Sequence, residues 1–161
     1  MPKPLIYIES SLLSYLAARP SREIVKQSRQ VISFDFWVWA QAECDCCVSA
    51  LTRDEIARGD SDAARRRLEF FNQCRLLPMP AGAQSLATQL IELHAVPRTE
   101  PEDAAHIAIS TLVQAKYIAS WNFAHIVGIE PRRLLERALE KLGYQAPILA
   151  TPEEILLSVK L

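Results

Sequence analysis

The stretch LIYIESS (residues 5–11) places a short apolar run directly before an acid and two serines. A continuously apolar run of this length is typical of a strand that is buried on both faces of a parallel sheet. Glu9 then stands at the carboxyl end of the strand, and Ser10 or Ser11 can cap a helix that begins near Leu12. The stretch therefore predicts a strand-to-helix unit with an acid at its turn.

The same alternation of strand and helix continues outward from this unit. Further strands are expected at residues 46–51, 75–79, 117–121 and 147–149, and helices over residues 22–43, 61–74, 84–94, 103–116, 131–142 and from 152 onward. The run FDFWVW within the first of these helices could also alternate as a strand, but the length of the segment favours helix. The pattern predicts an α/β fold of three layers, α/β/α, with a mostly parallel central sheet of four to five strands.

Two pairs of residues have the spacing of a capping box, in which a threonine precedes a glutamate by three positions. Thr52 is followed by Glu55, and Thr99 is followed by Glu102. In a capping box the two side chains bond to each other's backbone amides at the start of a helix. The spacing therefore predicts helices that begin at Thr52 and at Thr99.

Length and composition limit the class of protein. The 161 residues are half hydrophobic and 23% charged, as expected for one globular domain over residues 1–161. The net charge of −1 gives no support to a general nucleic-acid binder, so any nucleic acid must be held locally. No apolar run reaches the roughly 20 residues of a membrane helix and no secretory signal is evident, so we expect a cytoplasmic protein with no membrane partner.

The cysteines do not have the spacing of a metal or disulfide site. Cys44, Cys46 and Cys47 crowd into one segment and Cys74 stands apart, without the two paired CxxC motifs of a zinc site or a histidine nearby. We interpret them as reduced, mostly buried thiols, with zinc or redox chemistry as the less favoured alternative.

Polar residues that directly follow apolar strands are the first candidates for chemistry, because ligands of open α/β sheets bind beyond the carboxyl ends of the strands. Glu9 and Asn122 are such residues, although Glu9 alone could be a solvated helix-start acid. Glu55, taken alone, is better explained by its capping box than by chemistry. Asp103 is not needed by the second box and lies about 40° from Ile107 around the helix axis, so we expect it to border the packed face.

Carboxylates gathered in one cleft repel one another unless a cation neutralises them. Hard oxygen ligands of this kind favour Mg²⁺ or Mn²⁺ over zinc. Such a cation activates water and stabilises charge on an attacked phosphate, so the cluster predicts phosphodiester hydrolysis. His106 is interpreted as a packed helical residue outside the metal site.

Other polar residues are weaker candidates for substrate binding. Ser10 is expected to neighbour the metal, and Arg65 and Arg66 could contact phosphates, although charge runs on helices are usually solvated faces. The three tryptophans are interpreted as core or interface residues and not as stacking platforms.

The ordered segments IYIESSLLSYLAARPSRE, VSALTRDEIARGD, EPEDAAHIAIS and YIASWNFAHI resemble the PIN domain family, in particular its VapC-like branch. Position by position, the resemblance places Glu9, Glu55, Asp103 and Asn122 in the catalytic set, with the three acids as metal ligands. It also implies an RNA substrate, homodimerisation and, if the chain is a toxin, an antitoxin partner. The implied function is that of a divalent-metal-dependent ribonuclease, which uses Mg²⁺ or Mn²⁺.

The chain departs from the family pattern at its first acid, which is usually aspartate and here is Glu9. The longer side chain could reach the ion, favour Mn²⁺ or weaken the site, because Mg²⁺ demands strict geometry. One alternative is therefore a catalytically weakened PIN-fold protein that binds RNA or another protein. A second alternative is a small α/β interaction module whose acids are only caps and solvated turns.

Overall fold

The computed structural model describes residues 1–160 and contains a five-stranded sheet in which every pair of neighbouring strands is parallel. The strands are β1 (Leu5–Ile8), β2 (Asp45–Val48), β3 (Arg75–Leu76), β4 (Tyr117–Ala119) and β5 (Ile148–Ala150), in the spatial order β3-β2-β1-β4-β5. β1 is central, with Ile6 opposite Cys46 of β2 and Ile8 opposite Ala119 of β4. The carboxyl ends of β1 and β4 therefore meet at one edge of the sheet.

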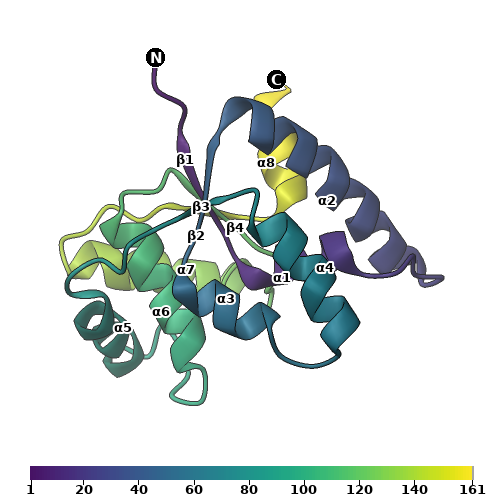
Figure 1. Ribbon diagram of the computed structural model, residues 1–161. Coiled ribbons are helices and arrows are strands. Elements are labelled where there is room, and N and C mark those ends of the chain that lie inside the picture. Colours follow the sequence, from purple (N-terminus) through teal and green to yellow (C-terminus); the bar gives the residue numbers. More distant parts are fainter. Residues whose placement is uncertain (161) are drawn as a thin grey trace.

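Helices cover both faces of the sheet (Figure 1). They are α1 (Ser10–Ala17), α2 (Ile24–Glu43), α3 (Ala50–Ile56), α4 (Ser61–Phe71), α5 (Ala83–Glu92), α6 (Pro101–Leu112), α7 (Ile129–Lys141) and α8 (Pro152–Val159). One hydrophobic cluster joins the sheet to α5, α6 and α7, and the other joins it to α1, α2 and α8. The three-layer α/β/α arrangement and the parallel sheet expected from the sequence are confirmed.

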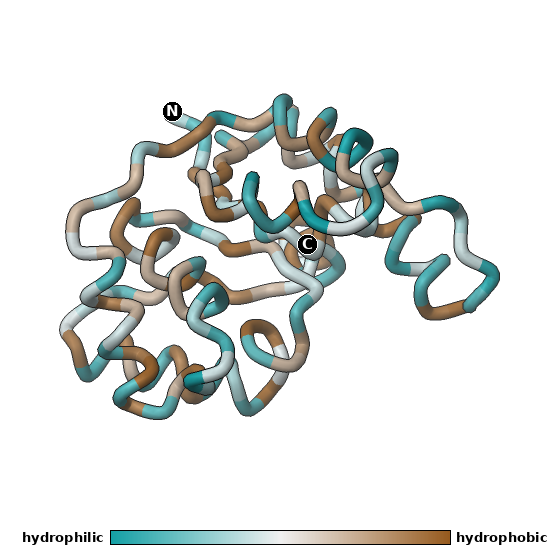
Figure 2. The backbone as a smooth tube through the Cα atoms, turned by 60° about the horizontal axis from the view of Figure 1, so that its bottom comes forward, coloured by the Kyte–Doolittle hydropathy of each residue, from teal (hydrophilic) through white to brown (hydrophobic). Residues whose placement is uncertain are grey.

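The side chains of β1 alternate between the two clusters. Ile6 and Ile8 pack on the side of α1 and α2, whereas Tyr7 points to the side of α6, and all three are fully buried. Burial of one such side chain contributes about 1.5–3 kcal/mol. The helices bury apolar residues against the sheet, and hydrophobic and hydrophilic residues alternate along their turns (Figure 2). This two-sided burial fixes β1, and with it the position of Glu9.

The segment that contains FDFWVW is helical, as its length predicted. α2 buries Phe36 and Trp37 against the sheet and leaves Val31 and Val38 exposed on its outer side. Trp37 and Trp121 are buried core residues, which agrees with the sequence-based interpretation of the tryptophans. None of the helices within residues 1–160 has the length and apolar character that a membrane crossing requires.

Both predicted capping boxes are wrong. β2 ends at Val48, and Ser49 caps α3 by accepting a hydrogen bond of 3.4 Å from the backbone amide of Thr52. Thr52 is fully buried instead, with its hydroxyl 3.4 Å from that of Tyr7. The helix thus starts earlier than expected, because the serine just before it reaches the free amides first.

The second box fails for a different reason. The N-cap of α6 is Glu100, with no side-chain capping bond, and Pro101 opens the first turn, as expected. Glu102 turns outward and pairs with Arg58, whose guanidinium donates bonds of 2.6 and 3.0 Å to it. A complete capping box occurs elsewhere, where Thr151 and Glu154 open α8.

The cysteines are free thiols. Cys44, Cys46 and Cys47 are buried and Cys74 is half-buried, and no disulfide joins them. Burial raises the pKa of the Cys47 and Cys74 thiols to about 12 and that of Cys46 still further. Such thiols stay protonated at neutral pH and are poor nucleophiles, as the sequence analysis expected.

Candidate metal centre

Glu9 lies where β1 and β4 end together. Its backbone amide donates to the carbonyl of Ala119 at 3.2 Å, and its side chain is only 4% exposed. The carboxylate caps α1: Oε2 accepts bonds from the amide of Ser11 at 2.8 Å, from the Ser11 hydroxyl and from the Ser120 hydroxyl at 3.0 Å. The predicted serine cap of this helix is therefore wrong, because the acid itself takes that position. All these bonds reach Oε2, so Oε1 is not engaged by them.

Glu55 is held at the same edge by contacts from two other elements. Its Oε1 accepts a bond of 2.9 Å from the Ser10 hydroxyl and also bonds to Nε2 of His106. Ser10, which was expected to neighbour the metal, thus contacts one of the candidate acids. Glu55 does not cap a helix, so its side chain is available for the contacts with Ser10 and His106.

His106 connects Glu55 to the protein core. The ring is fully buried, and Nδ1 lies 2.7 Å from the hydroxyl of Tyr7, which in turn lies 2.8 Å from the Ser49 hydroxyl. Burial lowers the pKa of the imidazole, but the Tyr7 hydroxyl and the Glu55 carboxylate at its two nitrogens outweigh burial and raise it to about 10. His106 was read from the sequence as a packed residue; it is packed, and it also positions Glu55.

Asp103 and Asn122 contact each other across the site. Asn122 Nδ2 donates to Asp103 Oδ1 at 3.2 Å, and Asn122 Oδ1 accepts from the backbone amide of His125 at 3.0 Å. Asp103 is 8% exposed, which confirms that it borders the packed face. Burial raises the pKa of its carboxyl, the Asn122 bond opposes that effect, and the charge of Glu9 adds to it. A buried acid of this kind is destabilised when ionised unless a cation stands beside it.

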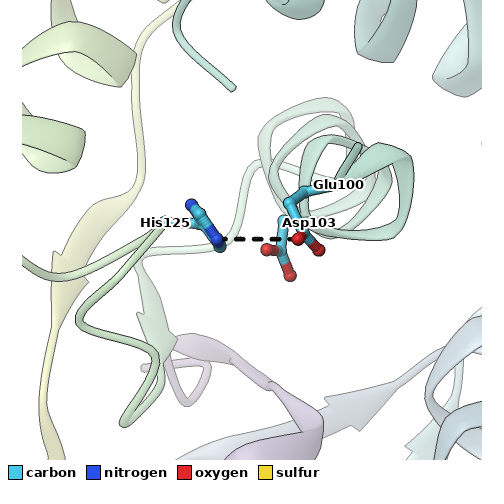
Figure 3. A group of neighbouring side chains, drawn as sticks. All are labelled: Glu100, Asp103 and His125. Atoms are coloured by element: carbon cyan, nitrogen blue, oxygen red, sulfur yellow. Dashed lines mark ion pairs between the residues drawn. The ribbon is translucent and has the colours of Figure 1, made fainter. Parts of the chain in front are cut away.

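Asp103 belongs to a group of three side chains that could hold a cation. Glu100, Asp103 and His125 offer ligand atoms that all lie within 4.8 Å of one another, and Nε2 of His125 lies 3.8 Å from Oε1 of Glu100. Figure 3 shows both carboxyl groups, from the start of α6, on the side of the His125 ring, which comes from the loop after β4. Within residues 1–160, Glu9 and Glu55 join no such group of three.

Glu100 and His125 were missed by the sequence analysis. Glu100 lies between Thr99 and Glu102 of the predicted capping box, and His125 lies in the YIASWNFAHI segment, but neither was predicted to bind a metal. Their signals were weak: Glu100 precedes the proline that opens α6, and His125 follows Asn122 by three residues. Only the folded loop brings the ring back to the carboxylates, through the bond between Asn122 and the His125 amide.

The donor set fits a divalent cation. Two carboxylates supply hard oxygen ligands, and among residues 1–160 no cationic side chain lies at ion-pair distance from the buried Asp103. The single imidazole suits transition ions such as Mn²⁺ better than Mg²⁺. The residues present therefore match the class of ion that the sequence predicted, with an added nitrogen ligand.

The loop that carries Asn122 and His125 is tightly closed. The Asn122 carbonyl accepts bonds from the amides of Ile126 at 3.0 Å and Val127 at 2.9 Å. A Cβ at Gly128 would lie 2.2 Å from the Phe123 carbonyl oxygen, so only glycine permits this approach.

The two candidate phosphate-binding arginines are on α4, away from this loop. Arg65 is exposed and lies 3.6 Å from Asp62 in an (i, i+3) pair. Arg66 Nε donates to the carbonyl of Ala17 at 2.9 Å, which ties α4 to the end of α1. Arg66 thus has a structural contact, and Arg65 remains a solvated cation with a weak pair.

Taken together, the fold and the site define a three-layer α/β/α protein with a PIN-like fold and carboxylates at the carboxyl edge of a five-stranded parallel sheet. A scan against models of protein families finds no match, and a search of curated proteins finds none. A solved chain with the same fold comes from the crystal structure of VapBC2 from Rickettsia felis bound to a DNA fragment from their promoter. The TM-score is 0.57 at 8% identity, over 91% of this chain and 98% of that chain, a likeness that shows the fold alone.

Proposed function

We propose that this protein is a divalent-metal-dependent endoribonuclease that hydrolyses RNA phosphodiester bonds. The observation that carries the proposal is Asp103, a buried carboxylate that Asn122 orients and that shares a ligand cluster with Glu100 and His125. The edge on which it lies is where ligands of open α/β sheets bind. The PIN-like fold, shared with a chain of the VapBC2 structure, supports the same function.

The proposed catalytic set is Glu9, Glu55, Asp103 and Asn122. A bound Mg²⁺ or Mn²⁺ supplies an acidified water and stabilises the charge that builds on the phosphate. Asp103 would bind the ion and Asn122 would orient Asp103 through its amide. Glu9 would contribute its unengaged Oε1, and Glu55, which Ser10 and His106 hold in place, would be the third acid that binds metal, at the main ion or a second one.

The proposed partners follow from the likeness to a complex. The solved relative is VapBC2, so we extend to this chain a protein partner of the antitoxin class and the role of a toxin. Homodimerisation is proposed with it, and light scattering of the purified chain measures it. Arg65 is kept as a proposed phosphate contact, whereas Arg66 is secondary because it already holds α1.

One observation favours a second candidate function, a PIN-fold protein with a weakened site that binds RNA or a protein. Oε2 of Glu9 is taken up by three donors that cap α1 and bridge to Ser120. An aspartate there has one methylene less, so its carboxylate would lie differently against these donors and the ion. Glu9→Asp distinguishes the two functions: a rise in cleavage supports the weakened site, and a fall supports a working Glu9.

The experiment that tests the proposed function is cleavage of a labelled single-stranded RNA with Mg²⁺, with Mn²⁺ and with EDTA. We expect cleavage that needs metal and that Asp103→Asn abolishes. The matched control is Asp35→Asn, which removes an exposed acid on α2 and should leave the rate unchanged. Cleavage that persists in EDTA, or in Asp103→Asn, would contradict the proposal.

A further inference from the structure

Phe123 is an exposed aromatic residue in the loop that also carries Asn122 and His125 of the candidate site. It follows Asn122 in the chain, and its side chain is 43% exposed. The ring rests on Trp121, with the two centroids 6.3 Å apart and the planes at 43°. Trp121 itself is buried and fixed by a bond of 2.9 Å from Nε1 to the Ser33 hydroxyl. Phe123 therefore presents an aromatic surface on a rigid support.

Arg29 of α2 completes this surface with a positive charge. Its guanidinium carbon lies 4.8 Å from the Phe123 ring centroid and 5.4 Å from that of Trp121. Nη1 donates to the Tyr15 hydroxyl at 3.2 Å. Within residues 1–160 no carboxylate lies at ion-pair distance from Arg29, unlike Arg132, which pairs with Glu154. Arg29 thus holds the aromatic residues together and still carries an unneutralised charge.

Phe123 and Tyr15, which both contact Arg29, each line a hollow that also contains cationic residues. One, of about 710 Å³, is lined by Phe123 together with Ile129, Arg132 and Arg133. The other is lined by Tyr15, the hydrogen-bond partner of Arg29, together with Arg19 and Lys26. Because the charges of Arg132, Arg133 and Lys26 are paired with glutamates, the attraction of this surface for a polyanion rests chiefly on Arg29.

We propose that Phe123 and Arg29 form a platform on which single-stranded RNA stacks one unpaired nucleobase, with the adjoining phosphate at the metal centre. The inference deepens the proposed function and rests on it for the identity of the ligand as RNA. Bases stack on exposed aromatic rings and on guanidinium planes, and this contact tolerates any base because every base has a π-face. A duplex keeps its bases paired and stacked on each other, so the platform selects single strands.

Binding measured without cleavage tests the platform. Fluorescence anisotropy of a labelled ten-nucleotide single-stranded RNA, in EDTA and at low salt, gives the dissociation constant. We expect Phe123→Ala to weaken binding about tenfold, or about 1.4 kcal/mol, and Phe123→Trp to retain it. Phe34→Ala is the matched control, because Phe34 is 46% exposed and also packs against an aromatic ring, that of Phe70, on the outside of α2.

A second ligand separates base stacking from charge. The same RNA with abasic positions keeps its phosphates, so the difference between wild type and Phe123→Ala should disappear with that ligand. Arg29→Gln should weaken the binding of both ligands, because Arg29 acts on the phosphates as well as on the base. Thermal unfolding of each variant shows whether the fold is intact, and Phe123→Trp keeps the test open if Phe123→Ala unfolds.

The possible results distinguish this inference from the proposed function. The platform is overturned if wild type and Phe123→Ala bind the RNA equally well, if wild type binds a matched duplex as tightly as the single strand, or if it does not bind the single strand. Each of these results counts against the platform even if the protein cleaves RNA. Binding that depends on Phe123, in a protein that cleaves nothing with Mn²⁺, retains the platform and overturns the nuclease.

Discussion

The hydroxyl of Tyr7 lies 2.7 Å from Nδ1 of His106, so the central strand contacts the buried residue that holds Glu55. A chain of hydrogen bonds through the His106 imidazole thus joins the hydrophobic core to the carboxyl edge of the sheet. Each buried polar atom in it has a partner, which is the condition under which such a network is stable. The position of Glu55 is therefore set by the core and not by a surface turn.

The charge of His106 should make stability depend on pH. Its pKa is raised to about 10 in the folded protein, against about 6.5 in the unfolded chain. The folded state thus binds the extra proton, so the stabilisation is complete below about pH 6.5 and is lost as the pH rises towards 10. In urea unfolding from pH 6 to 10, the free energy of unfolding of wild type should fall with pH more steeply than that of His106→Gln, by up to about 1.4 kcal/mol per pH unit. His94→Asn, a change at an exposed histidine, should keep the pH dependence of wild type. If His106→Gln also kept that pH dependence, His106 would not be the group responsible for it.

Asp103→Asn should raise the stability of the metal-free protein. Burial raises the pKa of Asp103, so its ionised form costs stability as the pH rises above the ordinary aspartate range. The amide keeps the shape and removes the charge. In thermal unfolding with EDTA the variant should melt at a higher temperature than wild type, and Mn²⁺ should raise only the wild-type midpoint. A Mn²⁺ shift in the variant equal to that of wild type would place the cation elsewhere.

His125→Asn should weaken the binding of Mn²⁺ more than the binding of Mg²⁺. The imidazole is the one nitrogen ligand in the cluster, and imidazole favours transition ions over Mg²⁺. Calorimetric titration should show a larger loss of affinity for Mn²⁺, about tenfold, than for Mg²⁺. Equal losses for the two ions would mean that His125 only pairs with Glu100.

Gly128→Ala should destabilise the loop that carries Asn122 and His125. The added Cβ would meet the Phe123 carbonyl oxygen at 2.2 Å, and that oxygen belongs to backbone that cannot move away freely. We expect a loss of about 2 kcal/mol in chemical unfolding, together with weaker Mn²⁺ binding. Gly59→Ala, where the space is open and only the φ of +82° is unfavourable, should cost about 1 kcal/mol and leave Mn²⁺ binding unchanged.

The sequence predicted the fold well because apolar runs carry most of the information about it. Leu5–Ile8 is apolar on both faces, and both faces are covered by helices. Helix starts were less predictable: the spacing of Thr52 and Glu55 fits a capping box, but Ser49 reaches the free amide of Thr52 first. Sequence spacing cannot decide between Ser49 and Thr52 as the cap. Their capping free energies differ by only a few tenths of a kcal/mol, and the difference depends on how deeply each hydroxyl is buried.

The site was predictable only in part, for a related reason. Strand ends and helix starts point to Glu9, Asp103 and Asn122, since each follows or begins an element. Contacts made by loops leave no periodic signal, so His125 became a candidate ligand only after the turn at Asn122 was known. His106 sits in a helix of small and apolar residues, and its bond to Glu55 depends on packing between two helices far apart in sequence.

The chemical ends of the RNA products test the central claim most directly. An ion held beside Asp103 would let water attack the phosphate without help from the neighbouring 2′-hydroxyl. We therefore predict fragments without a 2′,3′-cyclic phosphate, and continued cleavage when the 2′-hydroxyl at the cut site is replaced by hydrogen. These products should appear with Mn²⁺ and wild type and disappear with EDTA or Asp103→Asn. Cyclic phosphate ends, or cleavage lost with that single hydroxyl, would contradict metal-assisted hydrolysis at this site.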